Sequence, residues 1–162
     1  MIFLLQRKGA LVSIGDSPAF GSVNGVARSC GLKRIAERSG VPLVRFKRNK
    51  DIFRGSSSSF DLISKLPPEI RSTVARLSTV SETVRDFDAV INVPKLKAHV
   101  QMGFTAGVKN LYGCISGKEK VFRHFLVNDN KELFSLIILH IMTRVCPEFT
   151  IVDAVHTLEE RG

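Results

Sequence analysis

Apolar and polar positions in the N-terminal part of the chain switch between short apolar runs and helical spacing. Residues 10–14 form an apolar run that ends at a Gly-Asp-Ser-Pro turn, which predicts a strand. Ser22 can cap a following helix, helical spacing resumes over residues 32–39 and stops at Gly40, and residues 41–46 predict the next strand. Strand, helix and strand within about forty residues predict a βαβ unit with a right-handed crossover.

The middle of the chain contains a loop and then a confidently predicted strand. Serines and prolines over residues 54–68 predict a surface loop without a domain boundary. Residues 69–77 fit a helix by spacing and a strand by β-branched content, and residues 81–86 fit a short helix. Residues 89–93 predict a strand that Pro94 ends, which places the following lysine at the strand's carboxyl end.

The C-terminal part predicts two helices and a last strand. Residues 105–112 read as helical up to Gly113. Asp129 and Glu132 form a capping pattern ahead of a long helix that runs through Val145, and apolar residues on nearly every face predict its burial. Residues 149–152 predict a strand that delivers Asp153 at its end. We therefore predict one α/β domain over residues 1–162, with three layers and helices on both faces of a mainly parallel sheet.

Composition and charge narrow the classes of partner. The chain has 162 residues, 44% of them hydrophobic, and this argues against disorder. A formal net charge of +9 suits small anions, nucleic acid or an acidic membrane surface. Trp is absent, there is one Tyr, and most Phe residues lie in apolar runs, so a base-stacking surface is not indicated. Non-specific nucleic-acid binding through the basic face therefore stays the alternative hypothesis.

The cysteines and apolar segments predict a cytoplasmic protein. Cys30, Cys114 and Cys146 are far apart and odd in number, which argues against a disulfide scaffold and against a self-contained zinc or iron–sulfur site. Free cysteines fit a reducing compartment. Residues 2–5 are too short an apolar run for a signal peptide, and polar residues interrupt the segment 133–145. We expect no membrane partner.

Candidate chemistry concentrates in residues 93–124. Basic and imidazole side chains gather there against a single acid, Glu119, and between glycines; they are Lys95, Lys97, Lys109, Lys118, Lys120, Arg123, His99 and His124. A strand that delivers such residues onto a glycine-rich turn is how α/β proteins build sites for anionic groups. Lys95, Lys97 and His99 alternate, so an extended chain would point them to one face. The alternative is a basic edge strand that discourages aggregation.

For other polar residues, a structural or surface role is an alternative to the functional one. Lys109 drawn into a cleft would have a depressed pKa and could act as acid, base or imine-forming amine, whereas an exposed Lys beside a helix-weakening Asn110 is the alternative. His124 could donate to a phosphate or take a proton, or lie on the surface. His140 is interpreted as a hydrogen-bonded core histidine, and His156 as a loop residue.

Two acids follow predicted strands at opposite ends of the chain. Asp16 and Asp153 are interpreted as turn-stabilising residues or as ligands for substrate or a hard cation such as Mg²⁺. This signal is weak, so no metal site is assigned. The glycines of residues 102–113 match neither the dinucleotide fingerprint nor the P-loop pattern.

Three ordered motifs resemble a known family. They are IGDSPA at residues 14–19, FDAVINVPKLKAH at residues 87–99 and TAGVKNLYG at residues 105–113, and the downstream His124 and IVDAV at residues 151–155 fit as well. The chain is similar to the family named domain of unknown function 362. The family's motif positions fall on the residues singled out above: Asp16, Lys95, Lys97, His99, Lys109, Asn110, His124 and Asp153.

The resemblance implies an α/β domain from bacteria or archaea, in some members joined to a ferredoxin-like module with two 4Fe–4S clusters. Its activity is not established, so no reaction transfers. This chain lacks the cysteine-rich module, so no iron–sulfur cluster is assigned. Family members usually continue beyond residue 162, and the beginning of this chain is also short, which suggests a truncated member that is incomplete at both ends. A non-functional truncated fragment is therefore a second alternative hypothesis. We expect a small anionic ligand at the basic segment, with Lys109 and His124 as catalytic candidates, a redox link and a ferredoxin-like partner.

Overall fold

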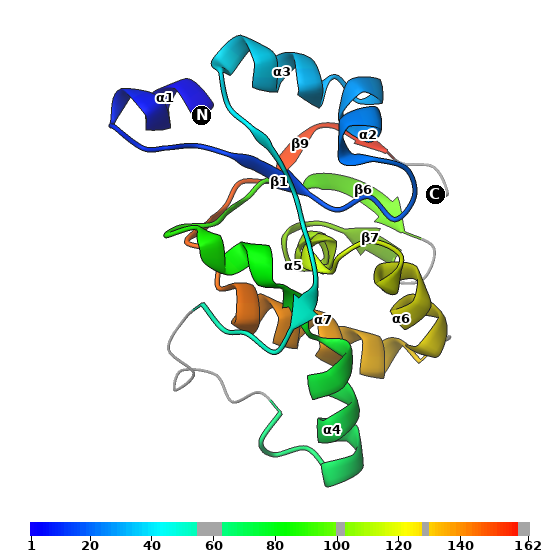
Figure 1. Ribbon diagram of the computed structural model, residues 1–162. Coiled ribbons are helices and arrows are strands. Elements are labelled where there is room, and N and C mark those ends of the chain that lie inside the picture. Colours follow the sequence, from blue (N-terminus) through cyan, green and yellow to red (C-terminus); the bar gives the residue numbers. More distant parts are fainter. Residues whose placement is uncertain (55–62, 100–102, 128–129, 159–162) are drawn as a thin grey trace.

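The computed structural model describes residues 1–54, 63–99, 103–127 and 130–158. Short helices and short strands alternate along the chain, and most of the helices lie around the strands (Figure 1). The chain is therefore an α/β protein, as the sequence predicts. The helices are α1 Ile2–Arg7, α2 Val23–Ser29, α3 Leu32–Ser39, α4 Pro68–Leu77, α5 Gly107–Asn110, α6 Glu119–Val127 and α7 Lys131–Val145, with 3₁₀ helices η1 Glu82–Asp86 and η2 Leu111–Cys114.

The described strands pair into four short sheets. They are β1 Ile14–Asp16, β2 Leu43–Arg45, β3 Asn49–Lys50, β4 Val80–Ser81, β5 Ile91–Asn92, β6 Lys95–His99, β7 Gly103–Thr105, β8 Phe149–Thr150 and β9 Asp153–Leu158. Three pairings are parallel, β1 with β2, β5 with β8 and β6 with β9, whereas β3–β4 and β6–β7 are antiparallel. Most of the described strand pairs are thus parallel, as predicted, but they belong to several short sheets.

The predicted βαβ unit is confirmed. Ile14 on β1 pairs with Leu43 on β2 in parallel, and α2 and α3 lie between them in sequence. The Ser22 hydroxyl accepts a hydrogen bond from the Gly25 N–H at 3.0 Å, which caps α2 as predicted. Gly40 ends α3 with a φ of +65°, a left-handed conformation that suits glycine.

Pro94 interrupts a longer parallel pair without ending it. Between β5–β8 and β6–β9, the Ile151 N–H donates to the Asn92 carbonyl at 2.9 Å and the Asp153 N–H donates to the Pro94 carbonyl at 2.8 Å. The chain therefore stays extended past Pro94. The prediction that Lys95, Lys97 and His99 share one face required this extended conformation. Asp153, predicted to follow the last strand, instead begins a further strand.

The structure settles one ambiguous prediction and changes the bounds of two other predicted helices. Residues 69–77 are helical in α4, and the helix predicted at residues 105–112 splits into α5 and η2. Asn130 caps α7 by accepting from the Leu133 N–H at 2.9 Å, so the cap lies one residue after the predicted Asp129, which is outside the described residues. Most of the predicted loop at residues 54–68 is also outside them.

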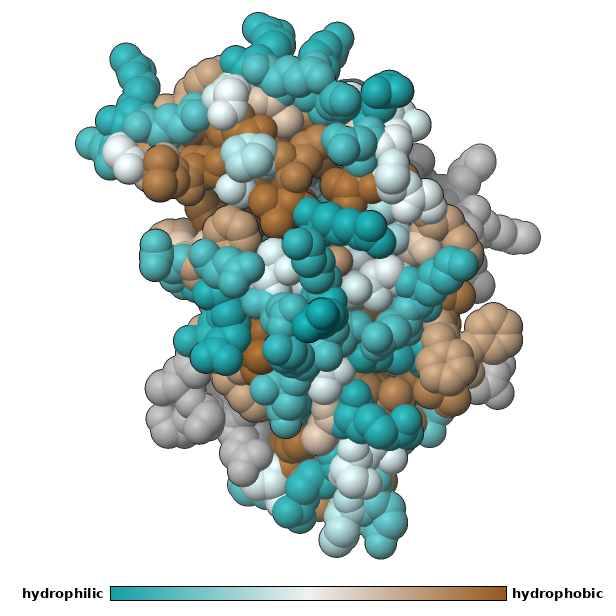
Figure 2. Space-filling model, viewed as in Figure 1, coloured by the Kyte–Doolittle hydropathy of each residue, from teal (hydrophilic) through white to brown (hydrophobic). Residues whose placement is uncertain are grey.

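Apolar side chains remain exposed around the N-terminal helix. Phe3 and Leu4 on α1 are exposed, and Leu11 on the following segment is fully exposed. A hydrophobic patch covers the region of α1 and α3 in the space-filling view (Figure 2). These residues are not part of the main core.

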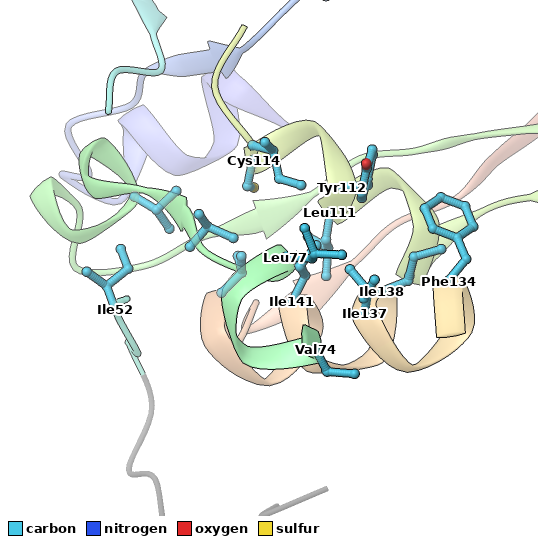
Figure 3. Packing of buried hydrophobic residues seen from close by; sticks show 14 of the residues in the cluster. Ile52, Val74, Leu77, Leu111, Tyr112, Cys114, Phe134, Ile137, Ile138 and Ile141 are labelled. Atoms are coloured by element: carbon cyan, nitrogen blue, oxygen red, sulfur yellow. The ribbon is translucent and has the colours of Figure 1, made fainter. Parts of the chain in front are cut away.

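The core is built around α7, which is buried as predicted. Figure 3 shows α7 side chains meeting those of α4 and η2. Phe134, Ile137 and Ile141 of α7 are almost completely buried, as is Val74 of α4. Within the described part of the chain no helix is long and apolar enough to cross a membrane.

A candidate anion site of lysine and histidine side chains

The β6 strand carries the first two basic side chains of the candidate site. Lys97 lies opposite Thr105 and His99 lies opposite Gly103 on β7. Residues two apart on a strand project to one face, so Lys97 and His99 share a face of the sheet. Lys97 is exposed, whereas His99 is half-buried.

The buried Asn92 fixes α5 against the parallel strand pair. Its amide nitrogen donates to the Gly107 carbonyl at 2.8 Å and to the Thr150 hydroxyl at 3.3 Å. Its amide oxygen accepts from the Asn110 amide at 2.8 Å. Gly107 permits this close approach, since a Cβ there would lie 2.9 Å from the Thr150 methyl carbon. Asn110, a predicted ligand-binding residue, therefore uses its amide nitrogen to anchor the helix that carries Lys109.

Lys109 extends from α5 over two aromatic rings. Its Nζ lies 6.0 Å from the centroid of the Tyr112 ring and 5.7 Å from that of Phe134. Burial, and to a smaller extent the positive charges of Lys97 and Lys120, lower the pKa of Lys109 to about 8. The depressed pKa matches the interpretation of Lys109 as a lysine drawn in from solvent.

His124 on α6 completes the group. Its ring centroid lies 4.7 Å from that of Phe134 and 6.2 Å from that of His99. Burial lowers the pKa of both imidazoles, and the charge of Lys109 lowers both further. The structure thus brings together four of the predicted site residues from β6, α5 and α6, named here the Lys/His cluster: Lys97, His99, Lys109 and His124.

Lys95 and Asp153 form a separate pair. The Lys95 ammonium lies 3.4 Å from an Asp153 carboxylate oxygen, and both side chains are about half exposed. The other carboxylate oxygen accepts from the Val155 N–H at 3.1 Å. This backbone hydrogen bond and the neighbouring Lys95 lower the pKa of Asp153. The structure therefore joins these two predicted ligand-binding residues to each other.

Asp16 lies at the turn after β1, beside a lysine that the predictions left out of the site. Its carboxylate accepts from the Ser17 N–H at 2.7 Å, which is the turn-stabilising role. The Lys120 ammonium donates to the Ser17 carbonyl, and the Gly117 N–H donates to the Ser17 hydroxyl at 2.6 Å. Burial lowers the pKa of Lys120, and the Asp16 carboxylate partly offsets this.

Lys120 could have been singled out from its place in the basic segment, but nothing in the sequence distinguished it from Lys118. Arg123, from the same segment, is structural. It donates to the Leu77 carbonyl at 3.0 Å and to the Thr79 carbonyl at 2.6 Å, and it pairs with Glu119 at 2.5 Å. In the described ranges of the chain, no group of three or more His, Cys, Asp or Glu side chains is placed to hold a metal ion.

These features define an α/β protein with a cationic cluster beside a parallel strand pair. The whole chain, residues 1–162, matches the family described as Domain of unknown function (DUF362). The chain belongs to this family, which confirms the resemblance drawn from its three motifs.

A curated relative can be aligned with almost the whole length of this chain. The thylakoid-associated protein sll1697 of Synechocystis sp. (strain ATCC 27184 / PCC 6803 / Kazusa) is 32% identical over 159 residues. The match covers 98% of this chain and 44% of the relative, so the chain spans less than half of the relative's length. No solved structure matches the chain.

Proposed function

We propose that the protein binds a small anion, a phosphate or a carboxylate, at the Lys/His cluster. The observation that supports this most strongly is the setting of Lys109. Its ammonium is partly buried over two rings and is pushed toward the neutral form by Lys97 and Lys120. For the described residues, the structure records aromatic contacts of Lys109 and no ion pair with a carboxylate.

Crowded cations are costly to hold in a folded protein. Each partly buried positive charge loses hydration, and each like charge nearby disfavours the protonated form. An anion bound between Lys97 and Lys109 would reverse both effects, because it would offer charge-assisted hydrogen bonds to both ammonium groups. Perturbed pKa values in such a cluster are also typical of functional sites.

The two imidazoles suit a hydrogen-bonding role in this site. The lowered pKa values of His99 and His124 leave both rings predominantly neutral at pH 7. A neutral imidazole can donate one hydrogen bond to an anion and can also accept a proton. With its pKa about 8, Lys109 is about one tenth neutral at pH 7. Lys109 and His124 are therefore the acid–base candidates of an enzymatic role, and a redox link to cluster-bearing members of the family is part of this proposal.

The test is calorimetric titration of inorganic phosphate and of oxalate into the unmodified protein, two site variants and one control variant. Lys97→Ala is the primary variant because Lys97 is exposed and its loss should not disturb folding. We expect each of Lys97→Ala and Lys109→Ala to weaken anion binding about tenfold, or about 1.4 kcal/mol. Lys65→Ala removes one exposed charge elsewhere and should bind like the unmodified protein. Equal binding by all four proteins would refute the site.

Salt dependence separates this proposal from non-specific nucleic-acid binding. Neutralising several phosphates of a nucleic acid makes affinity fall steeply with salt. We expect a shallow dependence for phosphate and weak binding of a short oligonucleotide at physiological salt.

Three further expectations belong to the proposal. One is the three-layer arrangement, with helices on both faces of a single mainly parallel sheet. Another is a ferredoxin-like partner. The third is a cytoplasmic location; the Synechocystis relative is itself a thylakoid-associated protein.

A further inference from the structure

A groove lies apart from the Lys/His cluster, between the segment that follows β2 and the 3₁₀ helix η1. It is open to solvent and has a volume of about 690 Å³, which lies in the range of small-molecule sites. Basic side chains enter it from both sides: Arg45, Lys47 and Lys50 from the β2 side and Arg85 from η1. Figure 1 shows the chain crossing the front of the molecule here, and Figure 2 shows hydrophilic side chains over the same part of the face. We call it the β2–η1 groove.

The loop that carries Lys47 is hydrogen-bonded to β4 and to η1. The Lys47 N–H donates to the Thr83 hydroxyl at 3.2 Å, and the Ser81 hydroxyl donates to the Lys47 carbonyl. The Glu82 N–H donates to the Arg48 carbonyl at 2.9 Å. Arg48 itself has a φ of +26°, a conformation rarely adopted by residues other than glycine. A strained residue fixed by surrounding hydrogen bonds is a feature that clusters at ligand-binding sites.

The charge within the β2–η1 groove is only partly neutralised. Glu82 pairs with Lys50 at 2.5 Å, and this contact is the main cause of the lowered pKa of the Glu82 carboxyl. Asp86 is the second acid of the lining. Three basic side chains, Arg45, Lys47 and Arg85, thus remain against one carboxylate.

Apolar residues line the groove as well. Leu43 and Val44 of β2 are half-buried, and Ile52 is part of the main hydrophobic core. A bare inorganic ion would make no use of these surfaces. A ligand that joins an anionic group to a larger organic body would use both the cations and the apolar lining, and the carboxylates could accept hydrogen bonds from its hydroxyl groups.

We propose that the β2–η1 groove is a second binding site, and that it takes a small organic phosphate with a hydroxyl-bearing, partly apolar body, such as a nucleotide. The phosphate lies against Lys47 and Arg85, and the body packs on Leu43 and Val44. This site is independent of the Lys/His cluster. A phosphodiester strand of nucleic acid offers the same chemistry, but the limited volume of the groove favours the small molecule.

The probe is adenosine diphosphate, titrated calorimetrically into the whole chain, with inorganic phosphate in a parallel series. We expect adenosine diphosphate to bind more tightly than inorganic phosphate. Lys47→Ala and Arg85→Ala should each weaken its binding about five- to tenfold, the usual loss for one charge-assisted contact. Both side chains are exposed, so neither variant should impair folding. Lys65→Ala and Arg38→Ala remove matched exposed charges elsewhere and should leave the affinity within about twofold.

Lys97→Ala distinguishes the two sites, because it should weaken inorganic phosphate binding at the Lys/His cluster and leave adenosine diphosphate binding unchanged. The groove proposal fails if adenosine diphosphate binds equally to Lys47→Ala, Arg85→Ala and the unmodified protein. It also fails if Lys97→Ala alone abolishes that binding. Tighter binding of a short single-stranded oligonucleotide, with a steep loss of affinity in salt, would overturn the small-molecule assignment.

Discussion

A buried polar network under α4 and the Lys/His cluster use the same kinds of side chain in opposite ways. In the network, the Ser78 hydroxyl and the His140 Nδ1 lie 2.6 Å apart, and Arg144 Nε donates to the same hydroxyl at 3.1 Å. The guanidinium of Arg144 also pairs with Asp51 and stacks 4.4 Å from the centroid of the Phe53 ring. His140 is thus the hydrogen-bonded core histidine that the sequence predicts.

The difference lies in the partners of each cation. Arg144 is only 1% exposed, yet it also donates to the Ile52 and Ala75 carbonyls at 3.4 and 3.3 Å. A buried charge is tolerated when acceptors surround it. Lys109 is less buried but faces other cations, and so burial and repulsion lower its pKa. The network is built for stability, whereas the cluster carries an uncompensated charge that a ligand can satisfy.

The largest expected effect comes from removing the central cation of the network. Arg144→Met leaves the Ser78 hydroxyl and the backbone carbonyls without their donor and should lower the free energy of unfolding by about 3 kcal/mol. Urea unfolding followed by circular dichroism measures it. Arg38→Met, the same substitution on the exposed face of α3, should change stability by less than about 0.5 kcal/mol. Similar stability of the two variants would contradict the structural role of Arg144.

Removing the shared hydroxyl should have an intermediate effect. Ser78→Ala takes the common partner from His140 Nδ1 and Arg144 Nε and should cost about 1–2 kcal/mol. Ser72→Ala is the matched control, because Ser72 lies on α4, the helix that Ser78 caps, and donates to the Glu69 carbonyl at 2.9 Å in an exposed position. The same unfolding measurement applies, and an equal loss in both variants would show that the network adds nothing.

The smallest effect is a pH dependence from Lys109. Its pKa is about 8 in the folded protein against a usual value of 10.5. Between these values the unfolded chain binds more protons, so the free energy of unfolding should rise with pH. Because the side chain is only partly buried, solvent screening reduces the rise to about 1 kcal/mol.

Comparing the unmodified protein with Lys109→Met isolates this contribution. Relative to Lys109→Met, the unmodified protein should gain about 1 kcal/mol in the free energy of unfolding as the pH rises from about 8 to about 10. Saturating phosphate should raise the pKa of Lys109 and flatten the dependence. If the two proteins show the same change of unfolding free energy with pH, the pKa of Lys109 is not lowered by folding.

Much of the fold follows from local patterns in the sequence. Ser22 and Gly40 mark helix ends through a side-chain oxygen and a left-handed backbone, both of which are local properties. The long apolar segment of α7 likewise predicts burial wherever it packs. Boundaries that depend on tertiary pairing were less accurate. The continuation of the strand pair beyond Pro94 is one example, since it depends on hydrogen bonds from residues about sixty positions away.

The candidate site divides in the same way. The sequence by itself determined that cations and histidines gather between residues 93 and 124, because the strand and its glycine-rich turn are sequential. Only the tertiary structure decided which of them meet. Lys95 pairs with Asp153 and Arg123 binds backbone carbonyls near α4, whereas Lys97, His99, Lys109 and His124 converge. Burial and the distance between charges are properties of packed elements, and no spacing along the chain contains them.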